Sequence, residues 1–434
     1  MSHPQDLSLV EQAGAIARGD LDPFEVLDAT LARLAERDGP INSTPVVFES
    51  ESRAMLASAP RGPLYGVPLT VKDMYALPWR AARNGTAFDL MAATTSSTYR
   101  RLRDAGAVIV GVANQHEFGV GTTGDRSAYG RVANPWNHDH CPGGSSSGGA
   151  AAVTARLVGA SLASDSGGST RLPASYCGVT GLKVTYGALP YDGYFGASTT
   201  FSAPGVLARD AADARLLAGV VLGRPLSNEG AATLRVGLLD PYWNNVDPAV
   251  AAACRDALDE SRWDLSEVRL AHAELAAAAS IARLTAEIPA PEREVLASLA
   301  PATRALVIAA QLMPAGMVPL ADRARAALRQ GVADLFSHYD LLVTPTTPTS
   351  APLFDQPFLT LPAGPVPVDS ANMGQACLAN ATGQPAISVS VGRDVDGLPM
   401  GLQLFAPWGR EDLLLNAAAH LEVTSERRHL EFPS

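Results

Sequence analysis

The stretch PGGSSSGGAAAVTARLVGASLASDSGGSTRLPASYCGVTGLKVTYG, residues 142–187, decides the fold of this chain. It holds two Gly/Ser clusters, which lie at 143–149 and 166–169 on either side of an apolar segment. Residues 149–158 have helical spacing, and residues 160–164 suit a short strand, so the segment predicts a helix and a strand between two turns. A flexible linker is the alternative for GGSSSGG alone, but the ordered pattern after it argues against one.

Strand-like and helix-like segments alternate on both sides of this stretch. Residues 96–106 predict a helix and residues 107–112 a buried strand, while residues 234–240 predict another strand and residues 411–422 a closing helix. Alternation of this kind favours an α/β fold. At 434 residues and 47% hydrophobic content the chain can bury a large core, and we expect residues 1–434 to form a single unit.

Charge and apolar content limit the classes of partner. The formal net charge is 33 minus 44, or -11, which argues against nucleic acid and against an anionic membrane surface. No apolar run approaches the roughly 20 residues of a membrane-spanning helix. The sequence shows no signal peptide, so the expected location is the cytoplasm.

The cysteines and histidines do not predict a metal site. The sequence HDHC at 138–141 stands alone, without a second ligand cluster or an HExxH motif. The four cysteines lack the paired spacing of a zinc site; they are Cys141, Cys177, Cys254 and Cys377. We therefore expect a loop at 138–141 and no metal cofactor.

Residues 142–187, together with GVPLTVKD at 66–73, resemble the two signature motifs of the amidase signature family of serine hydrolases. The resemblance spans roughly residues 6–422, with core motifs at 62–187. It is weakest at about 231–340, where we expect elements that select the substrate. The family resemblance implies a mixed central sheet covered by helices on both faces.

The resemblance also implies a set of site residues. It assigns Lys72 as the base, Ser145 as a bridging serine in a cis peptide, and Ser169 as the nucleophile; the two serines are 169 minus 145, or 24, residues apart, the usual family spacing. Asp165 and Arg171 match family positions that brace the catalytic loop. The oxyanion hole implied by the family consists of the backbone N–H groups of Ser166, Gly167, Gly168 and Ser169.

The chemistry of amide cleavage explains these residue types. A serine hydroxyl is a weak nucleophile and needs an adjacent base. Lys72 can be that base only when it is neutral, and it follows the apolar run VPLTV, which favours burial and a lowered pKa. We expect Ser145 to relay the proton of Ser169 to Lys72, which later returns it to the leaving amine. This reaction, hydrolysis of a small carboxamide through an acyl-enzyme, requires no metal or organic cofactor.

The substrate pocket is expected beside the catalytic segment. In the amidase interpretation the loop that contains Gly119, Gly121 and Thr122 borders the pocket. Tyr191 could line an acyl pocket, and core packing is the alternative for this aromatic side chain. The short chain and the GGSSSGG form resemble the branch of the family that contains indole-3-acetamide hydrolases, which implies an arylalkyl primary amide as substrate.

A formal dinucleotide motif lies in the same loop. Residues 119–124 satisfy G-x-G-x-x-G, and Asp139 follows Gly119 by 20 positions. A helix should open at such a motif, but the sequence SAYGRVANPWN that follows is rich in turn residues. The motif therefore does not predict nucleotide binding.

A second formal motif is G-x-S-x-G at 144–148. It would make Ser146 the nucleophile of an α/β-hydrolase, with Asp340 and His420 as its partners. That elbow requires a strand before the serine, whereas ANPWNHDHCPGG is typical of turns. We interpret the match as accidental.

Two other functions stay open. The first is the amidase component of a glutamine-dependent tRNA amidotransferase; against it, the aspartate that contacts glutamine in that group aligns with Met373. The second is a noncatalytic scaffold that binds an amide or a protein, which the joint presence of Lys72, Ser145 and Ser169 disfavours. The partners expected are a small amide and, at most, a second copy of the chain in a homodimer.

Overall fold

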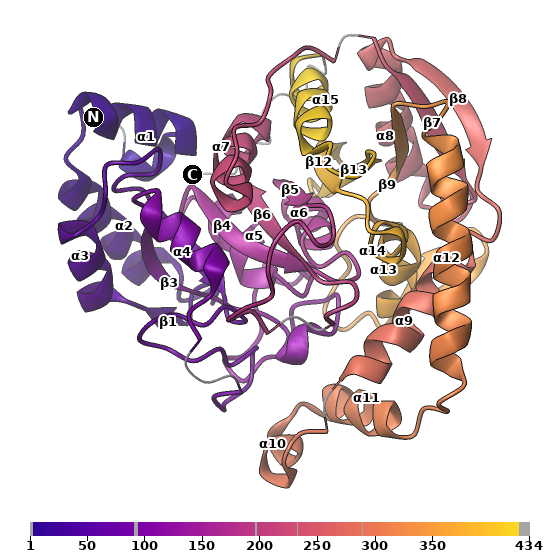
Figure 1. Cartoon of the computed structure of the whole chain (residues 1–434), viewed down its shortest axis with the longest axis horizontal. Helices are drawn as coiled ribbons and strands as arrows, with labels where there is room; N and C mark the ends of the chain where they lie inside the picture. The colour runs from indigo at the N-terminus through magenta and orange to yellow at the C-terminus, as the bar shows by residue number, and fades with distance from the viewer. Residues whose placement is uncertain (1–2, 91–93, 196–197, 232, 289, 425–434) are drawn as a thin grey trace.

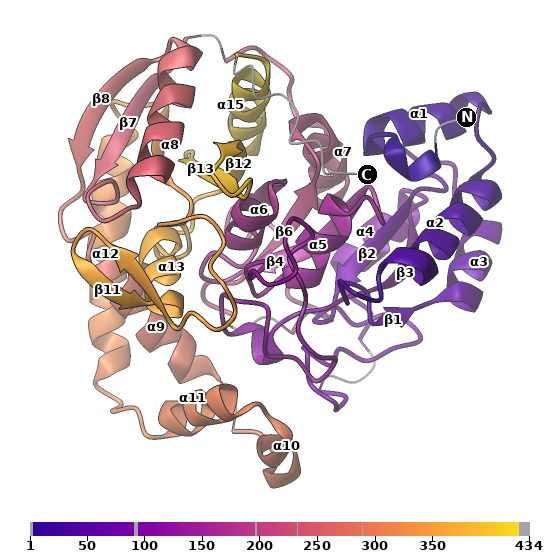
Figure 2. The ribbon, with the colours of Figure 1, turned by 180° about the vertical axis from the view of Figure 1, so that it is seen from behind.

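The computed structural model describes residues 3–90, 94–195, 198–231, 233–288 and 290–424. Its centre is an 11-stranded mixed sheet with helices on both sides (Figures 1 and 2), which confirms the predicted α/β class. In spatial order the strands are β1 (Val46–Val47), β3 (Val108–Ala113), β2 (Pro68–Lys72), β4 (Ala160–Asp165), β6 (Ala203–Ala208), β5 (Thr180–Lys183), β12 (Ala386–Arg393), β13 (Pro399–Phe405), β9 (Leu341–Pro345), β7 (Arg235–Asp240) and β8 (Asp264–Arg269).

The strands alternate their side chains between two cores, one on each face of the sheet. In β4, Leu162 belongs to the core packed by α1, α7 and α15, whereas its neighbour Ala163 belongs to the core packed by α2 and α5. This is the two-residue period of a strand buried on both faces. The helices of the first half are α1 (Leu9–Arg18), α2 (Pro23–Arg37), α3 (Glu49–Ala57), α4 (Ser97–Asp104), α5 (Ser147–Thr154), α6 (Arg171–Cys177) and α7 (Ala211–Leu222), with short 3-10 turns η1 (Pro4–Asp6) and η2 (Glu117–Gly119).

The helices of the second half include an arm that extends away from the sheet. In Figures 1 and 2, α10 and α11 lie at the end of this arm, which α9 and α12 connect to the body. A separate hairpin, β10 (Phe358–Leu361) and β11 (Gly364–Pro367), leads into α13. The helices here are α8 (Pro248–Ser261), α9 (Leu275–Glu287), α10 (Arg293–Ser298), α11 (Pro301–Gln311), α12 (Met317–Leu335), α13 (Val368–Ala376), α14 (Leu378–Thr382) and α15 (Glu411–Thr424).

The arm is anchored to the loop after β3. The Glu117 carboxylate accepts hydrogen bonds from the backbone N–H of Ala300, at 3.0 and 3.2 Å, and Ala300 immediately precedes α11. A carboxylate at this end of a helix complements its exposed N–H groups and its dipole. Phe118 packs against Ile288 and Val307 of the arm. The segment at about 231–340, where the family resemblance is weakest and which we call the variable segment, therefore contacts the loop that follows β3.

Local sequence signals account for the helix ends. Ser8 and Glu11 form a capping box at the start of α1, and Gly19 ends that helix with a left-handed backbone. Asp22 caps α2, which begins at Pro23. Across the described ranges, no helix combines the length and the apolar character that a membrane crossing requires.

Candidate active site

Lys72 is the last residue of β2, which lies between the parallel strands β3 and β4. Its side chain is buried, and Nζ donates hydrogen bonds to Ser145 Oγ at 2.8 Å and to Ser164 Oγ at 3.0 Å. Burial lowers the pKa of Lys72 to about 7, although the negative charge of Asp165 acts in the opposite direction. A fraction of this amine is therefore neutral near pH 7, as a base requires.

Ser145 follows a cis peptide bond from Gly144. A side chain at position 144 would not fit, because a β-carbon there would lie 2.8 Å from both the Gly121 carbonyl oxygen and His116 Cδ2. The Ser145 carbonyl accepts a hydrogen bond from the backbone N–H of His116, at 3.3 Å. The loop after β3 thus packs directly against the peptide that carries Ser145.

Ser169 lies in the turn that joins β4 to α6 and is 8% exposed. Its carbonyl accepts a hydrogen bond from the N–H of Ser146, at 3.1 Å, so its backbone is tied to the residue after Ser145. Gly168 has φ +110°, and a β-carbon there would lie 2.5 Å from Ala376 Cβ. The close approach of α13 therefore requires glycine immediately before Ser169.

Asp165 and Arg171 hold this turn from within the protein. Both are fully buried, and their ion pair measures 2.8 Å. The Asp165 carboxylate also accepts hydrogen bonds from the N–H groups of Gly168, at 2.8 Å, and Thr170, at 3.1 Å. Although burial disfavours its charge, the Arg171 guanidinium holds the pKa of Asp165 well below its usual range. The predicted bracing pair is present, and it engages the Gly168 N–H.

The loop at 119–124 borders this cluster and is not the start of a helix. Residues 120–146 form turns and isolated bridges, so the G-x-G-x-x-G match lacks the helix that nucleotide binding needs. Thr122 donates through its N–H and its hydroxyl to Asp369 of α13, at 2.8 and 2.7 Å. Gly121 contacts the cis peptide, as described above, and Gly119 ends η2.

His116 supports the same loop. Its Nε2 accepts hydrogen bonds from the N–H groups of Gly124, at 2.5 Å, and Thr123, at 3.3 Å. Burial and the nearby Arg126 charge lower the pKa of His116 to about 4. The imidazole is therefore neutral and accepts hydrogen bonds at neutral pH.

The structure does not assemble the alternative hydrolase triad. Ser146 Oγ donates to the Ser164 carbonyl, at 3.2 Å. Asp340 instead forms an ion pair with Arg235, and His420 Nε2 contacts the Ser261 carbonyl. No group of three or more possible metal-ligating side chains occurs within the described part of the chain, and His140 Nδ1 contacts the Ala351 carbonyl.

Apolar side chains surround Gly167. A β-carbon at this position would lie 3.4 Å from Met373 Cε, 3.4 Å from Cys377 Sγ and 3.9 Å from Leu284 Cδ1. Leu284 belongs to α9 and Met373 to α13, so these two helices face the predicted oxyanion residue.

Tyr191 contacts other aromatic rings. It packs against Tyr194, with ring centroids 5.7 Å apart, and its hydroxyl donates to the Ser202 carbonyl. A role for Tyr191 in substrate binding stays a prediction.

Three residues of this region were not singled out from the sequence. Ser164 is one of three polar residues of β4, with Ser161 and Asp165, and its place next to the Gly/Ser cluster was the available signal. No local pattern singled out His116 or Asp369. Asp369 is also distant in sequence from the loop it binds.

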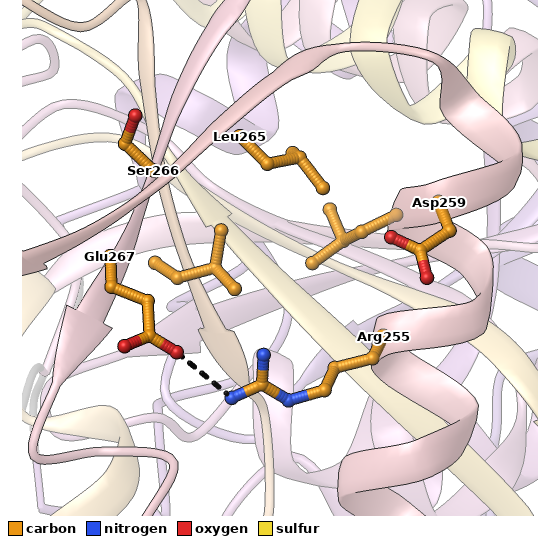
Figure 3. A pocket seen from close by; sticks show the side chains of 7 residues that line it. Arg255, Asp259, Leu265, Ser266 and Glu267 are labelled. Atoms are coloured by element: carbon orange, nitrogen blue, oxygen red, sulfur yellow. Dashed lines mark ion pairs between the residues drawn. The ribbon is translucent and has the colours of Figure 1, made fainter.

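Two hollows lie away from this cluster. One, of about 240 Å³, is bounded by α8 and by the edge strand β8, where Arg255 and Glu267 form an ion pair at 3.5 Å (Figure 3). Five strands separate β7 from β4 in the sheet. The other lies between α4, α7 and the end of α15. Neither is lined by Lys72, Ser145 or Ser169.

Comparison with known proteins gives consistent matches over most of the chain. A family model described as Amidase matches residues 25–415. The chain is 30% identical to a glutamyl-tRNA(Gln) amidotransferase subunit of Methylococcus capsulatus, over 96% of this chain and 97% of that protein. It is 34% identical to a fatty acid amide hydrolase of Medicago truncatula, over 76% of this chain and 59% of that protein. A crystal structure of an amidase superposes with a TM-score of 0.90 at 27% identity, over 96% of this chain and 99% of the other.

Proposed function

Because this chain belongs to the amidase family of hydrolases, which act on C–N amide bonds, we propose that it cleaves a small carboxamide through an acyl-enzyme on Ser169. The products are a carboxylic acid and ammonia or an amine. The observation that carries this proposal is the 2.8 Å hydrogen bond between Lys72 Nζ and Ser145 Oγ inside a buried site. It gives a serine hydroxyl direct contact with an amine whose pKa is lowered to about 7.

In the proposed reaction a proton moves along two serines to a lysine. Ser169 Oγ attacks the amide carbonyl while its proton passes to Ser145 Oγ, whose own proton passes to neutral Lys72. The Lys72 ammonium then returns a proton through Ser145 to the leaving nitrogen, and the C–N bond breaks. Water attacks the acyl-enzyme by the same route and releases the acid.

The proposed oxyanion hole consists of backbone N–H groups in the turn before Ser169. We retain Ser166, Gly167 and Ser169 as donors, because the Gly168 N–H already donates to Asp165. Donors fixed in a buried site stabilise the developing negative charge without reorganisation. The buried Asp165–Arg171 pair supports this arrangement because it holds the turn in one conformation.

For the substrate class we propose an amide with an apolar acyl group, an arylalkyl primary amide being the first candidate. Leu284, Met373 and Cys377 place apolar atoms around Gly167, within 3.9 Å of the position of a β-carbon there. Apolar surroundings favour a hydrocarbon or aryl group over a charged one, because burying a charge without a partner is costly.

A fluorophosphonate probe tests the nucleophile. The expected result is a single label on Ser169, located by mass spectrometry, that is lost in Ser169→Ala and kept in Ser146→Ala, the control at the neighbouring motif. A label on Ser146 would contradict the proposal, and absence of any label would favour a noncatalytic scaffold. A labelled protein is then screened against a set of primary amides that range from arylalkyl to polar.

The similarity to an amidotransferase component supports a second candidate function, release of ammonia from glutamine for a partner protein. Met373 disfavours it, since a thioether cannot pair with the ammonium group of glutamine. The two functions separate in one assay: hydrolysis of arylalkyl amides without glutaminase activity supports the first, and the reverse pattern supports the second. A homodimer and a cytoplasmic location stay predictions.

A further inference from the structure

A turn rich in hydroxyl residues, residues 198–202, lies between the arm and the proposed oxyanion hole. It has the sequence Ser-Thr-Thr-Phe-Ser and precedes β6. The Ser202 N–H donates to the Ser198 carbonyl, at 3.2 Å, and the Ser198 N–H donates to Ser202 Oγ, at 3.1 Å. The Thr200 N–H donates to Ser198 Oγ, at 2.9 Å. These reciprocal bonds hold the turn together as a small unit.

One end of the 198–202 turn contacts residues 166–169, which carry the proposed oxyanion donors and which we call the oxyanion loop. β4 and β6 pair antiparallel with Asp165 opposite Ala203, so the next residues outward, Ser166 and Ser202, also face each other. Their hydroxyl oxygens are 2.6 Å apart, and both side chains are buried. A hydrogen bond of this length inside the protein fixes the position of Ser166 relative to the turn.

Glu287, the last residue of α9, binds the other end. Its carboxylate accepts hydrogen bonds from Ser198 Oγ, at 2.7 Å, and from Thr199 through N–H, at 2.7 Å, and Oγ1, at 3.1 Å; Thr200 Oγ1 also donates to it. Burial acts to raise the pKa of Glu287, but these hydrogen bonds lower it below its usual value. An ionised carboxylate has only acceptor sites, so it suits four donors at once.

A second helix of the variable segment contacts the same turn. The Arg325 guanidinium of α12 stacks on the Phe201 ring, 4.2 Å from its centroid, and donates to the Thr200 carbonyl, at 3.3 Å. Arg283 of α9 donates to Thr200 Oγ1, at 3.3 Å, and lies 3.5 Å from Glu287. The turn is thus held by groups of α9 and α12, and of these groups Glu287 makes the most hydrogen bonds with it.

We propose that Glu287 is a positioning residue that fixes the 198–202 turn and, through Ser202, the Ser166 end of the oxyanion loop. The inference rests on the proposed function, since it assigns Glu287 a role in the same reaction. It gives the variable segment a route to the reaction rate that does not require contact with the substrate. A displaced oxyanion donor would slow the attack on the acyl carbon while substrate binding stays the same.

The test measures the kinetics of Ser169 labelling by a fluorophosphonate in the full chain. For Glu287→Gln we expect the maximal rate constant of labelling to fall by about tenfold to a hundredfold, with the half-saturating probe concentration within about threefold of wild type. Glu294→Gln, an exposed glutamate on α10, is the matched control and should label at the wild-type rate. A normal rate constant in Glu287→Gln, with only a lower melting temperature, would overturn the inference.

A double-mutant cycle with Ser202→Ala tests the route. If Glu287 acts through the turn, Glu287→Gln and Ser202→Ala together should be no slower than the slower single variant, within about twofold. Rate losses that multiply would instead show that Glu287 acts elsewhere.

A failure of the proposed function and a failure of this inference give different results. Lack of any Ser169 label in the unaltered chain would contradict the proposed function itself, and not only the role of Glu287. If Glu287→Gln does not fold, Ser198→Ala removes one donor to the same carboxylate and should show a smaller fall in the same rate constant; an unchanged rate constant there would count against the proposal.

Discussion

Lys72 and Lys183 are both fully buried, and burial lowers the pKa of each to about 7, yet their partners differ in kind. Lys72 Nζ donates to two hydroxyl oxygens, those of Ser145 and Ser164. Lys183 Nζ donates to two backbone carbonyls, Val184 O at 3.1 Å and Gln384 O at 2.7 Å. A carbonyl can only accept a hydrogen bond, whereas a hydroxyl can accept one or donate one.

This difference separates a base from a structural donor. When Lys72 is neutral, a serine hydroxyl can turn and donate a proton to its lone pair. When Lys183 is neutral, both of its partners still require a donor, so its hydrogens stay committed to them. Lysine burial and a lowered pKa are therefore not sufficient signs of catalysis; the partners of the amine decide.

The largest expected effect comes from replacing each lysine by methionine. Lys72→Met should slow phosphonylation of Ser169 by about a thousandfold, because the base is lost, whereas Lys183→Met should slow it less than about tenfold. The measurement is the second-order rate constant of labelling by a fluorophosphonate at pH 8. If the rate constant falls equally in the two variants, and circular dichroism shows that both are folded, the distinction between the two lysines is wrong.

The free energy of unfolding should show the reverse order, with the larger loss in Lys183→Met. Lys183→Met leaves the Val184 and Gln384 carbonyls without their donor, so the free energy of unfolding should fall by about 2 kcal/mol. Lys72→Met should cost less than about 1 kcal/mol, since serine hydroxyls can turn to other partners. Urea denaturation at pH 8 gives both values.

The pH dependence of this stability difference has a defined sign. Between pH 7 and 10.5 the unfolded chain holds the Lys183 proton and the folded chain does not. The free energy of unfolding of the wild type therefore rises with pH in this window relative to Lys183→Met. A difference that stays constant across this window would show that Lys183 keeps its proton in the folded chain.

The sequence predicted the elements that hold the site better than the contacts around it. The burial of Lys72 and the two Gly/Ser turns follow from an apolar run and from turn residues, which act locally. The family resemblance supplied the roles of Ser145 and Ser169, which no local pattern contains. In the same way, no local pattern distinguished the equally buried Lys183, which follows GVTGL, from Lys72.

Contacts between distant segments were beyond sequence reasoning. Asp369 binds Thr122 across nearly 250 positions, and Glu287 binds a turn almost 90 positions earlier. Such pairs depend on how the strands are ordered in the sheet, and a single sequence does not give that order. The region at 231–340 was expected to select substrate, but its hydrogen bonds to the 198–202 turn could not be predicted.

The pH dependence of labelling distinguishes the two lysines by a smaller effect. Neutral Lys72 is the reactive form, so the rate should rise with pH through a midpoint near 7 and level off above it. At pH 6 it should be about tenfold below the plateau. Lys183→Met should keep the same midpoint, and a shifted midpoint in that variant would assign the titration to the wrong lysine.

The smallest expected effect comes from removing one hydroxyl beside Lys72. Ser164→Ala deletes an acceptor of the Lys72 amine, which disfavours the ammonium form and lowers the pKa of Lys72 further. The midpoint of the labelling profile should therefore move to lower pH, and the plateau should fall by about threefold because a less basic amine takes the proton less readily. Ser161→Ala, in the same strand but bonded to Thr70, is the matched control and should leave the midpoint unchanged. If both variants keep the wild-type midpoint, the Ser164 hydroxyl does not tune the base, and the contrast with Lys183 rests on Ser145 alone.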